Sequence, residues 1–175
     1  MIEGSFWSIK SSAEQRQIMP AILIVCTANV CRSPMAEAIL KKILANQPDA
    51  DQWHVESAGT WATDGREPAF LSKYVMEKMG MDISEHRSQS ITLRMLEKFD
   101  LLLTMEEDHK RWLADQYRDY ADRTYMLSEM VGQVADISDP INGELSDYAE
   151  TAALLQRLLT EGLDEITRLA QHEEE

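Results

Sequence analysis

The chain holds two cysteines, and both lie in one ten-residue stretch, VCTANVCRSP, at residues 25–34. Cys26 is followed six positions later by Arg32 and then by Ser33. A thiol attacks as its anion, which a guanidinium, a helix N-terminus and a hydroxyl donor all stabilise. Arg32 can also donate hydrogen bonds to two oxygens of a phosphate group at once. The spacing therefore predicts a loop that closes around a phosphate, with the sulfur of Cys26 placed for in-line attack on phosphorus.

The residues on either side predict a strand before this loop and a helix after it. Residues 21–25 are wholly apolar, which is typical of a strand buried on both faces of a parallel sheet. Ser33 and Pro34 are favoured at the N-cap and first position of a helix, so we expect a helix to begin there. Free N–H groups at a helix start bind anions, and they would add to the positive potential of Arg32.

Strand and helix patterns alternate along the rest of the chain. Further strands are predicted at residues 53–57, 101–103 and 124–127. Further helices are predicted at residues 68–79, 92–98, 106–117 and 147–169, with a long loop at 128–146. This alternation implies a parallel sheet flanked by helices. Ligands of such sheets bind beyond the carboxyl ends of the strands, which is where Cys26 is expected to lie.

The composition narrows the class of protein and its partners. The chain has 175 residues, which suggests one domain, and 44% hydrophobic residues, enough for an ordinary core. A net charge of −14 argues against a nucleic acid or an anionic membrane as the main partner. No apolar stretch reaches the roughly 20 residues that span a bilayer, and the chain does not start with a secretion-signal pattern.

The cysteine count and the first residues complete the general expectations. Two cysteines form at most one disulfide, so we expect a cytoplasmic protein whose thiols are reduced. Residues 1–20 are interpreted as an extension that ends at Pro20, and no role is assigned to them. Residues 21–175 are expected to form a single domain. The histidines show no metal-ligand spacing, and no feature predicts an oligomeric state.

The chain resembles the low-molecular-weight protein tyrosine phosphatase family. That family's nucleophile loop reads V-C-x-G-N-x-C-R-S-P, and VCTANVCRSP follows it at all but one defined position. The resemblance runs from about residue 21 to the C-terminus and includes ESAGT, GMDISEHRSQSIT, FDLLLTM and DISDP. It implies a single phosphatase domain with a four-stranded parallel sheet, helices on both faces and a phosphate-binding loop after the first strand. It implies no cofactor and no metal.

The resemblance also implies hydrolysis of a phosphomonoester, carried by a phosphorylated protein or peptide, through a phosphocysteine intermediate. Cys26 is the implied nucleophile, Arg32 the phosphate clamp, and Asp139 the general acid that protonates the leaving oxygen and then activates water. The implied phosphate loop comprises Thr27, Ala28, Asn29, Val30, Cys31, Arg32 and Ser33. A hydrogen-bonded network that holds this loop in shape is implied for Asn29, Ser33, Ser57 and His86.

Some positions depart from the family pattern. Ala28 replaces a glycine, and alanine would be strained if the loop needs a positive φ there. Ile141 follows the Asp-Pro pair, where tyrosine-directed members have an aromatic wall for the phenyl ring. The loop after SAGT is shortened, and Trp61 could supply this wall from a displaced position or pack against its own loop. Trp61 and Ile141 are therefore the candidate substrate wall.

The substrate prediction depends on one loop position. The segment TMEEDHK, at residues 104–110, resembles a bacterial branch that includes protein-arginine phosphatases. That branch has threonine just before the second loop cysteine, where this chain has Val30. A hydroxyl there can orient water or contact the substrate, whereas valine cannot. We therefore favour phosphotyrosine over phosphoarginine as the substrate.

Two other functions on related sites are less favoured. Thioredoxin-coupled arsenate reduction needs further cysteines after the nucleophile, and none follows Cys31. A non-catalytic phosphopeptide-binding module would need neither a thiolate nor an acid, yet this chain keeps both. The role of Cys31 stays open between packing and a second thiol that protects Cys26 as a reversible disulfide.

Overall fold

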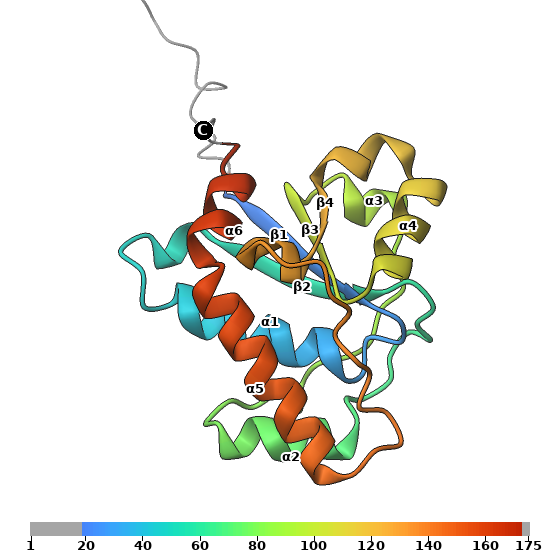
Figure 1. Cartoon of the computed structure of the whole chain (residues 1–175), viewed down its shortest axis with the longest axis vertical. Helices are drawn as coiled ribbons and strands as arrows, with labels where there is room; N and C mark the ends of the chain where they lie inside the picture. The colour runs from blue at the N-terminus through green and yellow to red at the C-terminus, as the bar shows by residue number, and fades with distance from the viewer. Residues whose placement is uncertain (1–18, 173–175) are drawn as a thin grey trace, which may run out of the picture.

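A computed structural model describes residues 19–172, which contain a parallel sheet of four strands (Figure 1). The strands are β1 (Ala21–Cys26), β2 (His54–Gly59), β3 (Leu101–Thr104) and β4 (Thr124–Met126). They lie in the order β2-β1-β3-β4, and each neighbouring pair is parallel. The four predicted strands are confirmed with small shifts of their ends. Because β1 lies between β2 and β3, residues that follow all three strands meet at one edge of the sheet.

Helices connect the strands and cover the sheet. The longer helices are α1 (Arg32–Leu44), α2 (Phe70–Lys78), α4 (Glu107–Gln116), α5 (Leu145–Glu161) and α6 (Leu163–Ala170). The shorter helical turns are α3 (Leu93–Leu96), η1 (Ala50–Gln52), η2 (Arg118–Arg123) and η3 (Leu127–Val131). Across residues 19–172, no helix is both long and apolar enough to cross a bilayer.

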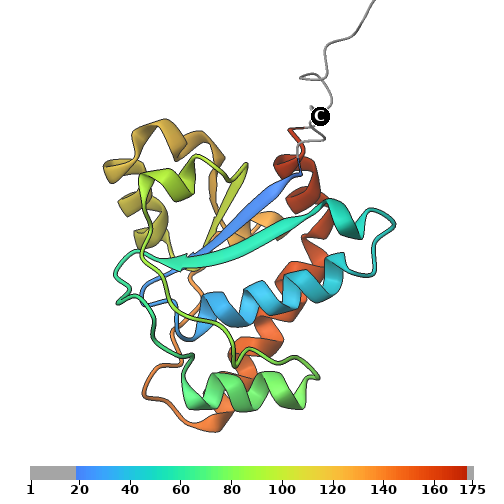
Figure 2. The same cartoon turned by 180° about the vertical axis from the view of Figure 1, so that it is seen from behind.

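Alternate residues of β1 pack into two separate cores. Ile22 and Ile24 belong to the larger core, which residues of α1, α2, α5 and α6 complete. Leu23 and Val25 belong to the smaller core on the opposite face, together with Leu113 of α4. Successive side chains of a strand point to opposite faces, so the fully buried β1 must be covered on both sides. The predicted α/β fold with helices on both faces is confirmed (Figure 2).

The C-terminal part differs from its prediction. The single helix predicted at residues 147–169 is divided into α5 and α6 at Gly162. A Cβ atom at Gly162 would lie 2.6 Å from Cβ of Met130 and 2.8 Å from the carbonyl oxygen of Leu158. Glycine therefore lets η3 pack closely against the break. The prediction of one helix was wrong because the apolar stripe continues across this break, and the predicted loop at 128–146 likewise begins inside η3.

The start of β1 is anchored at the edge of the sheet opposite to Cys26. The backbone N–H of Ala21 donates to Oδ2 of Asp100 at 2.8 Å. The carbonyl oxygen of Pro20 accepts the backbone N–H of His54 at 3.0 Å. Most of the extension predicted at residues 1–20 lies outside the described residues, so that prediction stays a prediction.

Candidate active site

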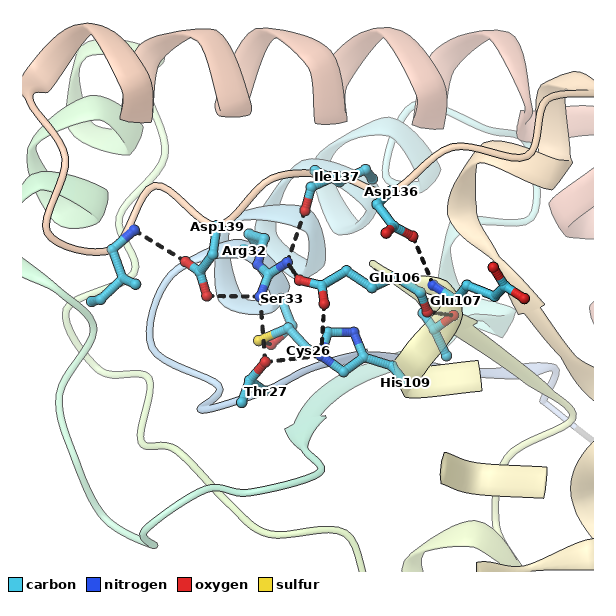
Figure 3. Close-up of polar contacts among 12 residues, drawn as sticks. Cys26, Thr27, Arg32, Ser33, Glu106, Glu107, His109, Asp136, Ile137 and Asp139 are labelled. Carbon is cyan, nitrogen blue, oxygen red and sulfur yellow. Dashed lines mark hydrogen bonds and ion pairs between the residues drawn. The ribbon is translucent and has the colours of Figure 1, made fainter. Parts of the chain in front are cut away.

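Cys26 is the last residue of β1, and the chain turns over it before α1 begins at Arg32 (Figure 3). The side chain is buried, but its sulfur contacts polar groups of the loop. It lies 2.9 Å from Oγ of Ser33 and accepts the backbone N–H of Asn29 at 3.3 Å. The sulfur is therefore held inside the turn by donors that an anion also accepts.

The same turn contains backbone N–H groups without a hydrogen-bond acceptor among the described residues. Among residues 19–172, no acceptor pairs with the backbone N–H of Thr27, Ala28, Val30, Cys31 or Arg32. The first N–H groups of a helix have no acceptor within the helix. Unpaired N–H groups therefore come from both the loop and the start of α1. Several such donors around one turn form a site for an anion, with the sulfur of Cys26 in the same turn.

Ser33 does not cap α1, contrary to the prediction. The helix begins at Arg32, its N-cap is Cys31, and no side chain caps it by a hydrogen bond. The hydroxyl of Ser33 instead contacts the sulfur of Cys26 and accepts from Nδ2 of Asn29 at 2.8 Å. A serine before a proline favours the N-cap locally, but the closure of the loop directs this hydroxyl to the sulfur.

Asn29 joins the loop to two other segments. Its φ of 55° lies in the left-handed region, which asparagine tolerates better than most residues. Its Nδ2 donates to Oγ of Ser33 and to Oγ of Ser57, the latter at 2.9 Å. Its Oδ1 accepts the backbone N–H of Gln89 at 2.9 Å, and its carbonyl oxygen lies 3.1 Å from Nε2 of His86. Every polar atom of this side chain is therefore paired.

Glu37, one turn after Ser33 on α1, extends the network of Asn29. Its Oε2 accepts from Oγ of Ser57 at 2.6 Å and lies 3.8 Å from Nδ1 of His86. Sequence analysis did not assign Glu37 a role. Its position four residues after Ser33, on the same face of a helix, is the signal that could have identified it.

The loop packs closely against β2 at Gly59, which pairs with Cys26. A Cβ atom at Gly59 would lie 2.4 Å from the carbonyl oxygen of Thr27, so only glycine allows this approach. Ala28 presents no corresponding problem, because it is not among the described residues with a positive φ. Alanine in place of the family's glycine therefore causes none of the strain that was considered above.

Arg32 is 1% exposed, and its guanidinium contacts three other segments. Its Nη1 pairs with the carboxylate of Glu106 and donates to the carbonyl oxygen of Ile137 at 2.8 Å. Its Nη2 donates to Oδ2 of Asp139 at 2.7 Å and to Oγ1 of Thr27 at 3.4 Å. Its Nε is buried and has no hydrogen-bond partner among the described residues.

The surroundings of Arg32 keep it charged. Burial by itself lowers the pKa of Arg32, but the hydrogen bond to Glu106 and the charge of Asp139 outweigh burial, and the pKa is raised. Because this buried cation is paired with the carboxylates of Glu106 and Asp139, an anion gains its positive charge by displacing one of them. Within residues 19–172, no group of His, Cys, Asp and Glu side chains could hold a metal ion.

Two residues beside Arg32 were not assigned by sequence analysis. Glu106 lies between β3 and α4, and His109 lies in the first turn of α4. Nε2 of His109 is 2.9 Å from Oγ1 of Thr27 and 3.9 Å from Oε2 of Glu106. A usable signal was present, because an acidic residue just after β3 must lie at the same sheet edge as Cys26.

Asp139 reaches the site on the loop between η3 and α5. The backbone N–H of Ile137 donates to the carbonyl oxygen of Met105 at 2.8 Å, which fixes this loop beside the end of β3. While Oδ2 of Asp139 accepts from Arg32, its Oδ1 accepts the backbone N–H of Ile141 at 3.1 Å. The carboxylate of Asp139 therefore contacts the guanidinium of Arg32 directly.

Trp61 and Ile141, the candidate substrate wall, both present exposed apolar surface. The backbone N–H of Trp61 donates to the carbonyl oxygen of Thr27 at 2.9 Å, so Trp61 is tied to the loop. Its side chain is 80% exposed, which argues against packing within its own loop. Ile141 is 45% exposed and lies two residues from Asp139.

Cys31 has different surroundings from Cys26. Its sulfur is buried and lies 3.8 Å from the hydroxyl of Tyr148. Burial raises the pKa of Cys31 to about 11, against the lowering effect of the Tyr148 hydroxyl. Cys31 is therefore a neutral thiol near pH 7, and a neutral thiol is a poor nucleophile. Both cysteines are free thiols in the structure.

Comparison with known proteins decides the family. The sequence model of the family described as low molecular weight phosphotyrosine protein phosphatase matches residues 21–172. The chain belongs to this family. Among curated relatives, the protein-arginine-phosphatase of Bacillus subtilis is 36% identical over 140 residues, which cover 79% of this chain and 91% of the relative. The low molecular weight protein-tyrosine-phosphatase PtpB of Staphylococcus haemolyticus is 37% identical over 143 residues, 79% and 94% of the two chains.

Solved structures of low molecular weight phosphatases have the same fold. An arginine phosphatase from Geobacillus stearothermophilus superposes with a TM-score of 0.78 at 29% identity, covering 89% of this chain and 97% of that one. A low molecular weight protein tyrosine phosphatase from T. tengcongensis superposes with a TM-score of 0.76 at 38% identity, covering 83% and 98%. The family therefore includes relatives named for two different phosphorylated residues.

In this low molecular weight phosphatase, the site residues that the family resemblance implies form two groups, one around Arg32 and one around Asn29. Arg32 and Asp139 are in direct contact, and Arg32 begins the helix that follows the turn over Cys26. Asn29 binds both Ser33 and Ser57, and its carbonyl oxygen contacts His86. Glu37, Glu106 and His109 are additions that the sequence analysis did not make.

Proposed function

We propose that this protein is a phosphomonoester hydrolase that removes phosphate from phosphotyrosine in proteins through a phosphocysteine intermediate. The observation that carries the proposal is the turn around Cys26, in which a sulfur, unpaired backbone N–H groups and the guanidinium of Arg32 occur together. Such a turn offers a nucleophile and oxyanion donors to one phosphoryl group. Membership of the phosphotyrosine phosphatase family supports it.

In the first step, the sulfur of Cys26 attacks phosphorus, and a sulfur–phosphorus bond forms as the bond to the ester oxygen breaks. Asp139 donates its proton to the leaving oxygen, so that the alcohol leaves neutral. Free N–H groups of the loop and Arg32 stabilise the charge on the equatorial oxygens. In the second step, Asp139 takes a proton from water, the water oxygen attacks phosphorus, and inorganic phosphate leaves the sulfur.

Asp139 must leave Arg32 for this sequence to proceed. Its Oδ2 accepts from Nη2 of Arg32 in the structure, and that donor is one that a phosphate oxygen would take. The buried Nε of Arg32, which has no partner among the described residues, is a second donor available to phosphate. Binding of phosphate would thus replace Asp139 on the guanidinium and free its carboxyl for the leaving oxygen.

Phosphoarginine is the second candidate substrate. The relatives from B. subtilis and G. stearothermophilus are named as arginine phosphatases, and two partly exposed carboxylates, Glu106 and Asp139, flank Arg32. Carboxylates could accept N–H donors of a phosphorylated guanidinium. We favour phosphotyrosine because Val30 is buried and offers no hydroxyl, while Trp61 offers an exposed ring beside the loop.

The proposal includes a phosphorylated protein or peptide as the partner and a cytoplasmic location. The 80% exposed Trp61 and the exposed Ile141 support a protein or peptide substrate, because they give apolar contact area beside the loop. A chain with two cysteines has no framework of several disulfides, and this supports a reducing compartment.

Hydrolysis of para-nitrophenyl phosphate without added metal tests the reaction, and Cys26→Ser should abolish it. His54→Gln is the control, because it changes an exposed side chain at the opposite edge of the sheet and should keep the activity. Full activity in Cys26→Ser would rule out covalent catalysis at this sulfur. The substrate class is tested by comparing kcat/KM for phosphotyrosine and phosphoarginine peptides of the same sequence, and a preference for phosphoarginine would make phosphotyrosine the wrong choice.

A further inference from the structure

His109 is a buried imidazole that the proposed reaction does not use. It lies in the first turn of α4 and is 5% exposed. Its Nε2 is 2.9 Å from Oγ1 of Thr27, the residue that follows the nucleophile (Figure 3). The imidazole and the loop come from segments 82 residues apart in sequence, so this contact depends on the fold.

At Thr27, the donor fixes the direction of one hydrogen bond, and the direction of the other is assigned. Nη2 of Arg32 can only donate, so Oγ1 of Thr27 accepts from it at 3.4 Å. We assign the proton of the Thr27 hydroxyl to Nε2 of a neutral His109, which lies 2.9 Å from the hydroxyl oxygen. This places the imidazole proton on Nδ1, which is buried and has no hydrogen-bond partner among the described residues.

The charged groups around His109 are consistent with a neutral imidazole. Burial lowers the pKa of His109, and the charge of Arg32 from α1 lowers it further. The carboxylates of Glu106 and Asp108, shortly before it in sequence, and of Asp139 on the opposite loop raise the pKa, and burial outweighs them. A neutral His109 can therefore accept from the Thr27 hydroxyl, as assigned above.

We propose that His109 is a positioning residue, which orients the Thr27 hydroxyl so that Thr27 holds Nη2 of Arg32 while Asp139 acts as the acid. This inference rests on the proposed function. Nη2 has two hydrogens, and in the structure they go to Asp139 and Thr27. When Asp139 turns to the leaving oxygen, Thr27 is the remaining protein acceptor of this nitrogen. Without His109, the hydroxyl is free to rotate and its lone pair is no longer fixed toward Arg32.

The test compares two replacements of His109 in para-nitrophenyl phosphate hydrolysis. His109→Leu removes the acceptor and should lower kcat/KM about tenfold, the effect of losing one well-placed hydrogen bond. His109→Gln should restore most of this loss, because a glutamine carbonyl can reach the position of Nε2 and accept from Thr27. His54→Gln is the matched control, because His54 is an exposed histidine at the opposite edge of the sheet, and its activity should equal that of the wild type.

A double-mutant cycle separates this role from general packing. Thr27→Val should lower kcat/KM by a factor similar to that of His109→Leu, and the double variant should lose no more than either single variant. Additive losses, or an equal loss in His109→Gln and His109→Leu, would overturn the inference while leaving the phosphatase proposal intact. If His109→Leu does not fold, His109→Asn replaces it, because its shorter amide cannot reach Thr27, and equal activity of the Asn and Gln variants would overturn the inference.

Failure of the proposed function has a different outcome. A wild-type protein that does not hydrolyse the phosphate ester would remove the phosphatase proposal. The contact itself is then measured by nuclear magnetic resonance of the imidazole nitrogens. A proton on Nδ1 of His109 near pH 7, with a changed Nε2 signal in Thr27→Val, would support the contact with Thr27. A proton on Nε2 would overturn it.

Discussion

The two sides of the loop over Cys26 are built in contrasting ways. On one side, Asn29 has each polar atom of its side chain paired with Ser33, Ser57 or Gln89. On the other side, Arg32 pairs with two carboxylates, and its Nε has no partner among the described residues. We call the side of Asn29 the neutral side and the side of Arg32 the charged side. The side chain of Asn29 has all its hydrogen bonds without a ligand, whereas the charged side has groups that a phosphate would displace or pair with. The contrast suggests that one side fixes the shape of the loop and the other performs the chemistry.

Arg32→Lys should give the largest effect and tests the charged side alone. Lysine keeps the positive charge but cannot present two parallel donors to a phosphoryl group. We expect kcat/KM for para-nitrophenyl phosphate to fall about a thousandfold, with a smaller change in melting temperature than Asn29→Ala causes. If kcat/KM falls less than about tenfold, the guanidinium is not the main group that stabilises charge in the transition state.

Asp139→Ala should give the next largest effect and tests the second member of the charged side. We expect about a hundredfold loss of kcat with a poor leaving group, because a strongly basic leaving oxygen needs a proton. The loss should be much smaller for para-nitrophenyl phosphate, whose leaving group is stable as an anion. Steady-state kinetics across a series of aryl phosphates measure this, and an equal loss for all of them would exclude Asp139 as the acid.

Asn29→Ala tests the neutral side through stability. The change removes hydrogen bonds to Ser33, Ser57 and Gln89 and places alanine at a φ of 55°. We expect the free energy of unfolding to fall by about 3 kcal/mol, measured by denaturant unfolding. Activity should fall as well, because the loop loses its shape. A stable Asn29→Ala variant with low activity would mean that this side also takes part in the chemistry.

The smallest expected effect is a pH dependence of stability that comes from His109. Its pKa in the folded protein is lowered, mainly by burial, below the ordinary value near 6.5. As the pH falls below about 6.5, the unfolded chain takes up this proton before the folded one does, so the folded state loses stability. Melting temperatures at pH 7.5 and at pH 5.5 should therefore differ less in His109→Gln than in the wild type.

His54→Gln serves as the control for this pH measurement, because it removes an exposed imidazole from the far edge of the sheet. Its melting temperatures at the two pH values are compared with those of the wild type and of His109→Gln. If the melting temperature of His109→Gln falls on acidification as much as that of the wild type, His109 does not titrate below its ordinary range, and the charged side contributes no such pH dependence.

The elements of the fold were largely predictable, because their signals are local. The apolar run at β1 can be buried on both faces only in a covered parallel sheet, and the structure covers it on both. The errors arose where two segments approach each other. Gly162 divides the last helix because Met130 packs against it, and Ser33 turns to Cys26 instead of capping α1. Neither approach is visible in the spacing of nearby residues.

The sequence by itself determined the candidate nucleophile, the arginine six residues later and the sheet edge at which they lie, because one turn between a strand and a helix fixes all three. Only the tertiary structure decided what surrounds Arg32. Glu106 and Asp139 contact its guanidinium from segments tens of residues away in the chain, and His109 contacts the neighbouring Thr27. The physical reason is that parallel strands bring their carboxyl ends to one edge, so residues distant in sequence share one buried charge.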